Sequence, residues 1–571
     1  MQLENNMICK ASRPVGEQGK VTRVLASAFI LPVVLSYFGS LNPVDGATSV
    51  SQYGITWTFS QDRTVGQFAN GDWWVVGPVT IISINPPAAT ADGKDINGTM
   101  VNPVYNTTGI PLWNPVQAWD GRIDWKAGCD TSYHDSLNIA KQLPYTAVVG
   151  DSMMSAKSFI EYQSGNKAQL DTIAILTVLE STPYPGSFRP PYIGGSNKSI
   201  RWNKSQLRYD RLKKLTNVTN TPTFAEMEPQ FEKAFIVQSP GFASNYLLPR
   251  AHDETNYGRE ISLKNSEAAL LLNLNYTDAQ KETLLIRMIQ RGIDLYGALS
   301  VGGGWWSDGG HHVGKKLPVV LAGWILDDAD IISKAGTHYF QEDGGHAYVK
   351  QSDIELNAER ALHNAKIWAS DQQAPQEMYT TAMIGIPEWF GNEHRTAGSQ
   401  WSSPYRGTNG WSLIGSVLAA RLMGAESVWN SPATFDYHDR YWQEVMVKGT
   451  ALGAGETGVP TPFVIAMWNA YRGGEGGTIT PATKFLVSNR IEASKITDVR
   501  ASGSLAATLV GIQTQGTLGS ILAGPVQMDG ITWWQVNYDG GADGWSDENN
   551  FIKSSIQPTS PSPPARLRVV K

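Results

Sequence analysis

QKETLLIRMIQRGIDLYG, residues 280–297, is the stretch of this 571-residue chain with the clearest structural period. Its apolar side chains Leu285, Met288, Ile289, Ile293 and Tyr296 follow one another at intervals of three, one, four and three residues. Spacing of that kind lines one face of an α-helix. We therefore predict an amphipathic helix here, packed through that face against a core.

Similar helical patterns follow toward the C-terminus, separated by long loops rich in Gly, Trp, His or Tyr. They are KLPVVLAGWILDD (316–328), IELNAERALHNAKIWA (354–369) and GWSLIGSVLAARLMGAESVW (410–429). Amphipathic helices that alternate with such loops are typical of an α/α toroid, in which helix pairs close a core and the loops at one end form a cleft. The sequence favours a mainly α toroid over residues 223–494, with an ordinary irregular helical domain as the alternative.

The N-terminal part of the chain carries strand patterns instead. YGITWTF (53–59), GDWWVVGPVTIISI (71–84) and TIAILTVL (172–179) are β-branched or aromatic runs bounded by Gly, Pro and Asn. Such runs are typical of β-strands. They predict a β-rich module over residues 48–222, of which 183–222 is a connector rich in Pro, Gly and Asn.

The composition changes again after residue 494. Residues 495–553 contain short apolar runs separated by Gly-rich turns, which predict a small all-β barrel. DVRASGS (498–504) and GITWWQVNYDGGADGWS (530–546) resemble the bacterial SH3-like domain, which implies an accessory that binds cell wall or matrix. Residues 554–571 are rich in Pro and Ser and are expected to be disordered. The predicted fold is therefore multidomain.

Composition and charge exclude some classes of protein. The net charge is −6, charged residues are only 17%, and the basic residues are scattered, so we expect no nucleic-acid partner. Hydrophobic residues at 41% and 20 tryptophans exclude disorder for most of the chain.

The N-terminus has the layout of a secretory signal. Basic residues between Lys10 and Arg23 precede the apolar run from Val24 to Phe38, which is short for a membrane span of roughly 20 residues. We predict a signal peptide over 1–47 and a secreted or periplasmic protein, with an uncleaved anchor as the alternative and no other membrane segment. Cys9 lies in this leader and leaves Cys129 alone, so no disulfide framework is predicted.

The loop GGGWWSDGGHHVGKKL, residues 302–317, is the densest group of functional side chains. Trp305 and Trp306 offer flat faces on which sugar rings stack, and His311 and Lys315 add a titratable group and a cation for a carboxylate. The alternative is that one Trp and one His only pack in a core. Neither GxxxxGK[ST] nor GxGxxG is present, and neither HExxH nor CxxC, so we predict no cofactor and no catalytic metal.

A second group lies within residues 384–415 and includes Trp389, His394, Arg395, Tyr405 and Arg406. A Tyr–Arg pair beside a His suits β-elimination of a uronic acid. The proton on C5 becomes acidic when Arg or His neutralises the neighbouring carboxylate, after which Tyr or His removes it and a Tyr protonates the leaving oxygen. The alternative is that Tyr405 and Arg406 join the loop to the core.

A third group, His252, Tyr257 and Arg259, precedes a helical segment, and His346 follows in EDGGHAYVKQ. Five of the nine histidines fall in Gly-rich or aromatic loops, which favours one shared site.

Four motifs together carry a family resemblance: GGHHVGKK (309–316), PEWFGNEH (387–394), SPYRG (403–407) and VLAARLMGAESVWN followed by FDYHDRYW (417–442). Over roughly 80–490 the chain resembles secreted bacterial polysaccharide lyases with an α/α toroid, of the alginate and glucuronan lyase type. Such lyases often use Asn or Gln to neutralise the uronate, whereas Asp308 stands in the loop here, and an anion there would repel an acidic sugar.

We therefore predict a lyase that cleaves an acidic, uronate-containing polysaccharide, with Tyr405 as proton donor, His394 or His311 as base, and Arg406 and Arg395 as carboxylate neutralisers. Further predicted substrate-binding residues are Trp305, Trp306, Lys315, Tyr257, Arg259, His346 and Trp389. One alternative is an inverting glycoside hydrolase that uses two of Asp308, Glu388 and Glu393. The other is a non-catalytic protein that binds glycan or cell wall.

Overall fold

The computed structural model describes residues 43–104, 116–124, 131–163, 167–237, 257–305, 310–344, 346–355, 380–389, 409–449, 458–473, 485, 489–528, 531–554 and 556. The chain divides into two compact units. Unit 1 comprises Met1–Glu342 and Leu418–Asn430, and unit 2 comprises Asp343–Val417 and Ser431–Lys571. Among the described residues, no helix is both long and apolar enough to span a membrane.

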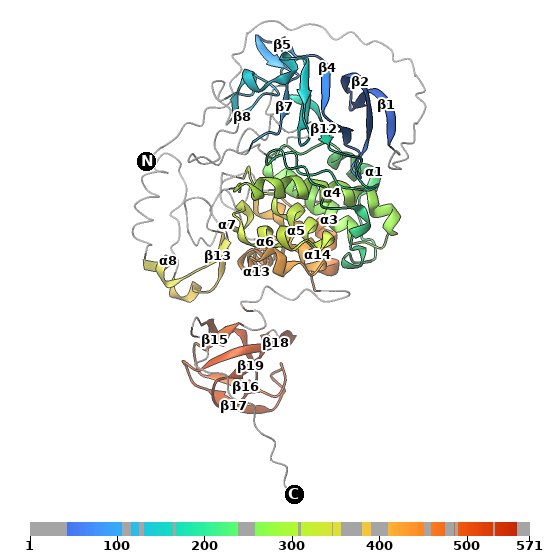
Figure 1. Cartoon of the computed structure of the whole chain (residues 1–571). Coiled ribbons are helices and arrows are strands. Elements are labelled where there is room, and N and C mark those ends of the chain that lie inside the picture. The colour runs from blue at the N-terminus through green and yellow to red at the C-terminus, as the bar shows by residue number, and fades with distance from the viewer. Residues whose placement is uncertain are drawn as a thin grey trace, which may run out of the picture. The chain divides into compact units, whose positions relative to one another are not determined.

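Unit 1 begins with an eight-stranded sheet, drawn in blue and cyan in Figure 1. Its strands are β1 (Val44–Gln52), β2 (Ile55–Gln67), β3 (Trp73–Val76), β4 (Val79–Asn85), β7 (Thr99–Val101), β10 (Tyr145–Ala147), β11 (Ser152–Ser158) and β12 (Leu170–Leu179). The order is β10-β4-β2-β3-β12-β11-β7, with β1 paired to β2. All of these pairs are antiparallel except β12 with β3. The predicted β-rich N-terminal region is confirmed.

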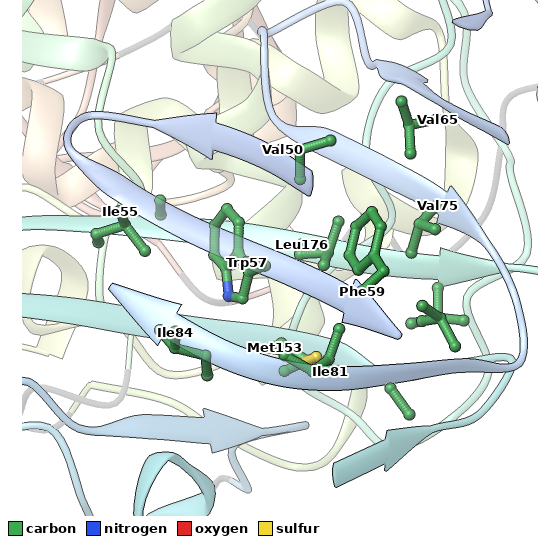
Figure 2. Packing of buried hydrophobic residues seen from close by; sticks show 14 of the residues in the cluster. Val50, Ile55, Trp57, Phe59, Val65, Val75, Ile81, Ile84, Met153 and Leu176 are labelled. Carbon is green, nitrogen blue, oxygen red and sulfur yellow. The ribbon is translucent and has the colours of Figure 1, made fainter. Parts of the chain in front are cut away.

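The core of this sheet follows the alternation of its strands. Ile55, Trp57 and Phe59 point to the same side of β2 and are at most 2% exposed. They pack with Leu176 of β12 and Met153 of β11, as Figure 2 shows. Burial of a large apolar side chain stabilises a fold by roughly 1.5–3 kcal/mol, so these positions anchor the module.

Short elements surround the sheet. They are β5 (Ala89–Ala91) paired with β6 (Lys94–Ile96), β8 (Val116–Gln117) paired with β9 (Ser132–Tyr133), and the 3-10 helices η2 (Asp135–Leu137), η3 (Ile139–Lys141), η4 (Lys204–Gln206) and η5 (Tyr209–Arg211). β1 begins at Val44, inside the segment predicted as a leader.

Helices follow the sheet in unit 1 (Figure 1). They are α1 (Phe224–Met227), η6 (Glu228–Phe231), α3 (Gly258–Leu272), α4 (Asp278–Ser300), α5 (Lys316–Leu326), α6 (Ala329–Thr337), α7 (Gln341–Gly344), which crosses into unit 2, and α12 (Glu426–Trp429). The helices predicted from 280–297 and 316–328 are confirmed as α4 and α5. Thr277 and Gln280 form a reciprocal capping box that fixes the start of α4.

A buried ion network joins the sheet to α4 within unit 1. The Arg189 side chain is fully buried and donates from Nε to Asp72 Oδ2 at 2.6 Å and from Nη1 and Nη2 to the Asp294 carboxylate at 2.9 and 2.6 Å. Asp72 lies between β2 and β3, whereas Asp294 lies on α4. Arg189 belongs to the segment predicted as a connector, and it packs here as core.

Unit 2 contains helices and short strands ahead of a C-terminal sheet. They are β13 (His346–Tyr348), α8 (Gln351–Glu355), η8 (Thr381–Met383), β14 (Pro387–Trp389), η9 (Gly410–Leu413), α11 (Ile414–Leu422), which crosses into unit 1, α13 (Pro432–Tyr441), the π-helix η10 (Trp442–Val447) and α14 (Pro462–Tyr471). Most of the helix predicted over 354–369 lies outside the described residues. The α/α toroid predicted over residues 223–494 includes residues of both units and stays a prediction.

The C-terminal sheet has seven strands: β15 (Arg490–Ala493), β16 (Thr497–Arg500), β17 (Leu509–Gln513), β18 (Leu518–Met528), β19 (Ile531–Tyr538), β20 (Gly544–Asp547) and β21 (Phe551–Lys553), with η11 (Glu548–Asn550) before the last. Their order is β17-β16-β20-β19-β18-β15-β21. Phe485, Ile491 and Trp534 belong to its core. The predicted C-terminal β region is confirmed, and its sheet includes residues that precede 495.

Candidate functional site

Several of the predicted site residues lie outside the described residues. They are Tyr405, His394, Arg406, Arg395 and Trp306, together with His252 and the proposed hydrolase carboxylates Asp308 and Glu393. The remaining ones fall into two groups. Tyr257, Arg259, Trp305, His311 and Lys315 belong to unit 1, and His346 and Trp389 belong to unit 2.

The structure brings Tyr257 and His311 together although 54 positions separate them. Their ring centroids lie 4.4 Å apart in an edge-to-face arrangement. Tyr257 is the N-cap residue of α3, and the next residue, Gly258, packs so closely on the backbone that a side chain there would collide with the Gly310 carbonyl oxygen. The glycine therefore lets the start of α3 reach the loop that carries His311.

Two cations lie beside this pair. The Arg259 guanidinium lies over the Tyr257 ring, 5.0 Å from its centroid, and Lys315 Nζ donates to the His311 carbonyl at 3.2 Å. Arg259 Nε also donates to Glu260 Oε1 at 2.7 Å, which offsets part of its charge. Lys315 is only 1% exposed. The group Tyr257, Arg259, His311 and Lys315 is called the Tyr–His cluster below.

The environment of His311 keeps its ring neutral. Burial, followed by the positive charges of Lys315 and Arg259, lowers the pKa of His311 from 6.5 to about 3. A neutral imidazole can accept a proton at neutral pH.

A carboxylate fixes the turn that leads from His311 into α5. Glu342 Oε1 accepts hydrogen bonds from the backbone N–H groups of Gly314, Lys315 and Lys316 at 2.8–2.9 Å. An acidic group at a helix N-terminus satisfies N–H groups that have no partner within the helix. Gly314 has φ +90, and a side chain there would strike the backbone of Ser262 on α3. In the GGHHVGKK motif, Gly314 is therefore required for close packing of the backbone on α3, whatever the role of His311.

The same loop is tied to α3 and α4. Asn265 Nδ2 donates to the Gly314 carbonyl at 2.5 Å, and Asn265 Oδ1 accepts from Arg291 Nη1 at 2.9 Å. Burial lowers the pKa of Arg291 to about 9. This second layer of hydrogen bonds holds the Tyr–His cluster in place.

The tryptophans predicted to stack on sugar are buried. Trp305 is 1% exposed and packs against Phe340 with ring centroids 5.4 Å apart, and Trp389 is 2% exposed. A ring enclosed in this way presents no face to a sugar, so both rings serve as core in this structure. The sequence cannot distinguish the two uses, because stacking and core packing favour the same side chain.

A second cluster of titratable and aromatic side chains lies in unit 2. His346 of β13 lies 4.7 Å from Trp389 of β14, 4.8 Å from Tyr437 and 5.0 Å from His438, measured between ring centroids. His438 Nδ1 lies 2.7 Å from the Thr434 carbonyl oxygen one turn earlier on α13. These rings are at most 6% exposed.

Charged pairs flank this second cluster. The Tyr348 hydroxyl donates to Asp436 Oδ2 at 2.5 Å, and burial followed by the Asp436 charge raises the pKa of Tyr348. Glu388 is fully buried and accepts from Arg440 Nη1. Because Glu388 is enclosed and bound to Arg440, it presents no carboxylate to a substrate in the hydrolase alternative. The sequence analysis missed this use of FDYHDRYW (435–442), in which Asp436 and Arg440 lie four residues apart and so share one face of a helix.

Within the described ranges, no three His, Cys, Asp or Glu side chains are grouped so that they could hold a metal ion. Both cysteines lie outside those ranges.

Comparison with known proteins gives short matches only. The chain is 30% identical over 86 residues to the 1,4-alpha-glucan branching enzyme of Nitrosospira multiformis, which covers 15% of this chain and 11% of that enzyme. It is 26% identical over 110 residues to the branching enzymes of Mycobacterium tuberculosis and Mycobacterium ulcerans, covering 19% of this chain and 14% of each enzyme. No protein-family model matches, and no solved structure matches. The chain thus spans a small part of these relatives, and no family is established.

Proposed function

We propose that this chain is a carbohydrate-active enzyme that cleaves a uronate-containing glycan by β-elimination, with the Tyr–His cluster at the reacting site. The observation that carries the proposal is the contact between a tyrosine and a neutral histidine beside Arg259 and Lys315.

The chemistry assigns each group a step. Arg259 binds the uronate carboxylate, which stabilises the negative charge that develops when the C5 proton leaves. Lys315 is only 1% exposed and supplies its charge from the interior, without contact to the substrate. His311 accepts that proton, the electron pair of the C5–H bond forms the C4=C5 double bond, and the C4–O bond breaks. The Tyr257 hydroxyl protonates the departing oxygen. The sequence-predicted roles of Tyr405, His394, Arg406 and Arg395 belong to the same proposal as a second candidate set.

A second candidate function is cleavage or transfer of α-glucan, which the similarity to branching enzymes favours. That chemistry needs carboxylates as acid and base or nucleophile. Glu388 is held by Arg440 in the interior, so Asp308 and Glu393 remain as its sequence candidates.

We also propose that the protein is secreted or periplasmic and that its C-terminal sheet attaches it to cell wall or matrix. They rest on the leader-like pattern at residues 10–38 and on the resemblance of residues 495–553 to SH3-like domains.

The test is a panel of alginate, glucuronan, pectate, hyaluronan, heparan and an α-1,4-glucan, incubated with the full chain. A lyase creates a C4=C5 double bond that absorbs in the ultraviolet, whereas cleavage of the α-glucan creates reducing ends without that absorbance. Reducing ends without absorbance on every active substrate would contradict the lyase proposal and support the second candidate.

Variants then test the Tyr–His cluster on the active substrate. Tyr257→Phe removes only a hydroxyl and should lower turnover by roughly 10²–10⁴. Tyr276→Phe is the matched control, because it also removes one hydroxyl, which accepts a hydrogen bond from Asn217 Nδ2 at 2.7 Å and belongs to no group proposed to act on the substrate. Equal turnover of the two variants and the wild type would remove Tyr257 from the mechanism.

A further inference from the structure

A cleft in unit 1 lies at the end of β12, away from the residues assigned above. It has about 450 Å³ of free volume, and binding sites for small molecules have volumes of roughly 300–1,000 Å³. Three segments line it: the turn at 149–150 between β10 and β11, residues 178–184 at the end of β12 and after it, and the loop 196–200. The free volume is therefore sufficient for a small organic ligand.

Core packing holds two of these segments together. Val178 and Leu179 are the last residues of β12 and are at most 5% exposed. Leu179 packs with Phe68 and Trp74, and Ile200 of the loop packs against the same cluster. The end of β12 and the loop 196–200 therefore keep their positions whether or not a ligand is bound.

Two further contacts fix the loop 196–200. Gly150 has φ +93, and a Cβ there would lie 2.0 Å from the Ser196 carbonyl oxygen, so only glycine lets the turn and the loop approach this closely. Lys198 is 6% exposed, and its Nζ donates to the carbonyls of Pro191 and Tyr192 at 2.9 and 3.1 Å. A cleft whose walls are fixed in advance loses less conformational entropy when a ligand binds.

The lining combines an exposed aromatic ring with uncharged hydrogen-bonding groups. The Tyr184 side chain is 85% exposed, and Val149 beside the cleft is 43% exposed. The polar lining comes from Ser181, Thr182, Ser196, Asn197 and Ser199. A sugar ring has C–H groups on its faces, which stack on an aromatic ring, and hydroxyl groups at its edge, which both donate and accept hydrogen bonds. The lining of the cleft matches both parts of such a ring.

The charges of the cleft favour an uncharged ligand. Of the lining residues, only Glu180 and Lys198 have ionisable side chains that carry a charge near neutral pH. Glu180 is exposed and forms no ion pair with the described residues. Burial, followed by the charge of Arg189, lowers the pKa of Lys198 to about 7, and two carbonyls already accept from its Nζ. An acidic sugar would therefore meet an uncompensated carboxylate and no available cation.

We propose that this cleft binds an uncharged oligosaccharide, with one sugar ring stacked on Tyr184 and its hydroxyl groups bonded to the Ser, Thr and Asn side chains of the lining. The cleft shares no residue with the Tyr–His cluster, so the proposal holds whether or not that cluster is catalytic. Its role is to hold a glycan, and no bond is broken there.

The experiment titrates the full chain with cellohexaose, maltohexaose and mannohexaose by isothermal calorimetry, and with a mannuronate hexamer as the charged comparison. Tyr184→Ala should weaken binding of the neutral hexamer about tenfold, and Thr182→Ala, which removes one hydroxyl, should weaken it several-fold. Ile160→Ala removes another exposed side chain, 68% exposed and outside the cleft, and should leave affinity within twofold of the wild type. Because Tyr184 is so exposed, its substitution should leave the thermal unfolding temperature unchanged, which circular dichroism measures.

Binding of a neutral hexamer that Tyr184→Ala weakens and Ile160→Ala does not would support the site. Absence of binding by all three neutral hexamers would overturn the proposal, and so would equal affinity of the two variants. Tighter binding of the mannuronate hexamer than of any neutral hexamer, if Tyr184→Ala abolishes it, would show that the cleft takes an acidic sugar instead. None of these outcomes depends on cleavage, so they are separate from the ultraviolet assay of the proposed function.

Discussion

Substitution of His311 by Gln should change how the stability of the protein depends on pH. The pKa of His311 is lowered from 6.5 to about 3, so between these values the unfolded chain binds a proton that the folded chain excludes. Stability therefore falls as pH decreases below 6.5. At pH 5, about 1.5 pH units below the ordinary value, this one group costs about 2 kcal/mol of unfolding free energy.

Urea denaturation of wild type and His311→Gln at pH 7.5, 6 and 5 measures this cost. Other groups titrate in both proteins, so the expected signal is the difference between their unfolding free energies. From pH 7.5 to pH 5, this difference should change by about 2 kcal/mol in favour of the variant. Lys315→Met removes one of the charges that lower the pKa of His311, and should flatten the pH dependence in part, because burial is the larger cause. Parallel pH profiles of wild type and His311→Gln would show that the ring is not held neutral.

Three further outcomes follow from the structure and the sequence. Arg189→Met leaves Asp72 and Asp294 buried without their cation and should lower the unfolding free energy by about 3–5 kcal/mol in the same denaturation assay. Arg208→Met breaks only exposed pairs and should leave the unfolding free energy nearly unchanged. A chain that ends at residue 484 should give more soluble protein on expression than a chain that ends at residue 494. The longer chain keeps Phe485 and Ile491 but lacks most of the sheet that buries them. Equal yields of soluble protein would contradict this. If the sequence-predicted set acts in elimination, Tyr405→Phe should lower turnover on the active glycan by roughly 10²–10⁴ and Arg406→Lys should also lower it, since lysine lacks the planar fork that binds a carboxylate through two bonds.

Local pattern predicted the elements of the fold better than their partners. TIAILTVL is a nearly continuous apolar run, and β12 is buried along almost its whole length between β3 and β11. Nothing in that run indicates that β3, about 100 positions earlier, pairs with it in parallel. The sequence around Arg189, which is rich in Pro and Gly, does not indicate that this arginine connects the sheet to α4. Pairings of this range depend on the packing of the whole unit.

The sequence predicted which types of residue gather near the candidate site, but it did not predict which of them are buried in the core. Gly-rich flanks singled out His311, and Tyr257 was selected with Arg259 because both precede a helical segment; the structure places the two rings in contact. The same reasoning selected Trp305 and Trp389, which are buried. Aromatic side chains in Gly-rich loops therefore predict close packing of some kind, and only burial separates a core ring from one that can meet a ligand.

The low pKa of His311 bears directly on the proposed elimination. A base with a pKa of about 3 is always ready to accept a proton at neutral pH, but it holds the proton weakly, and general bases work best with a pKa near the working pH. After burial, the causes of the low value are the charges of Lys315 and Arg259, and Arg259 is the group proposed to bind the uronate carboxylate. A carboxylate bound to Arg259 would offset that charge and so raise the pKa of His311. Under the proposed function, the substrate would thus strengthen the base that acts on it, and a neutral sugar at the same place would not.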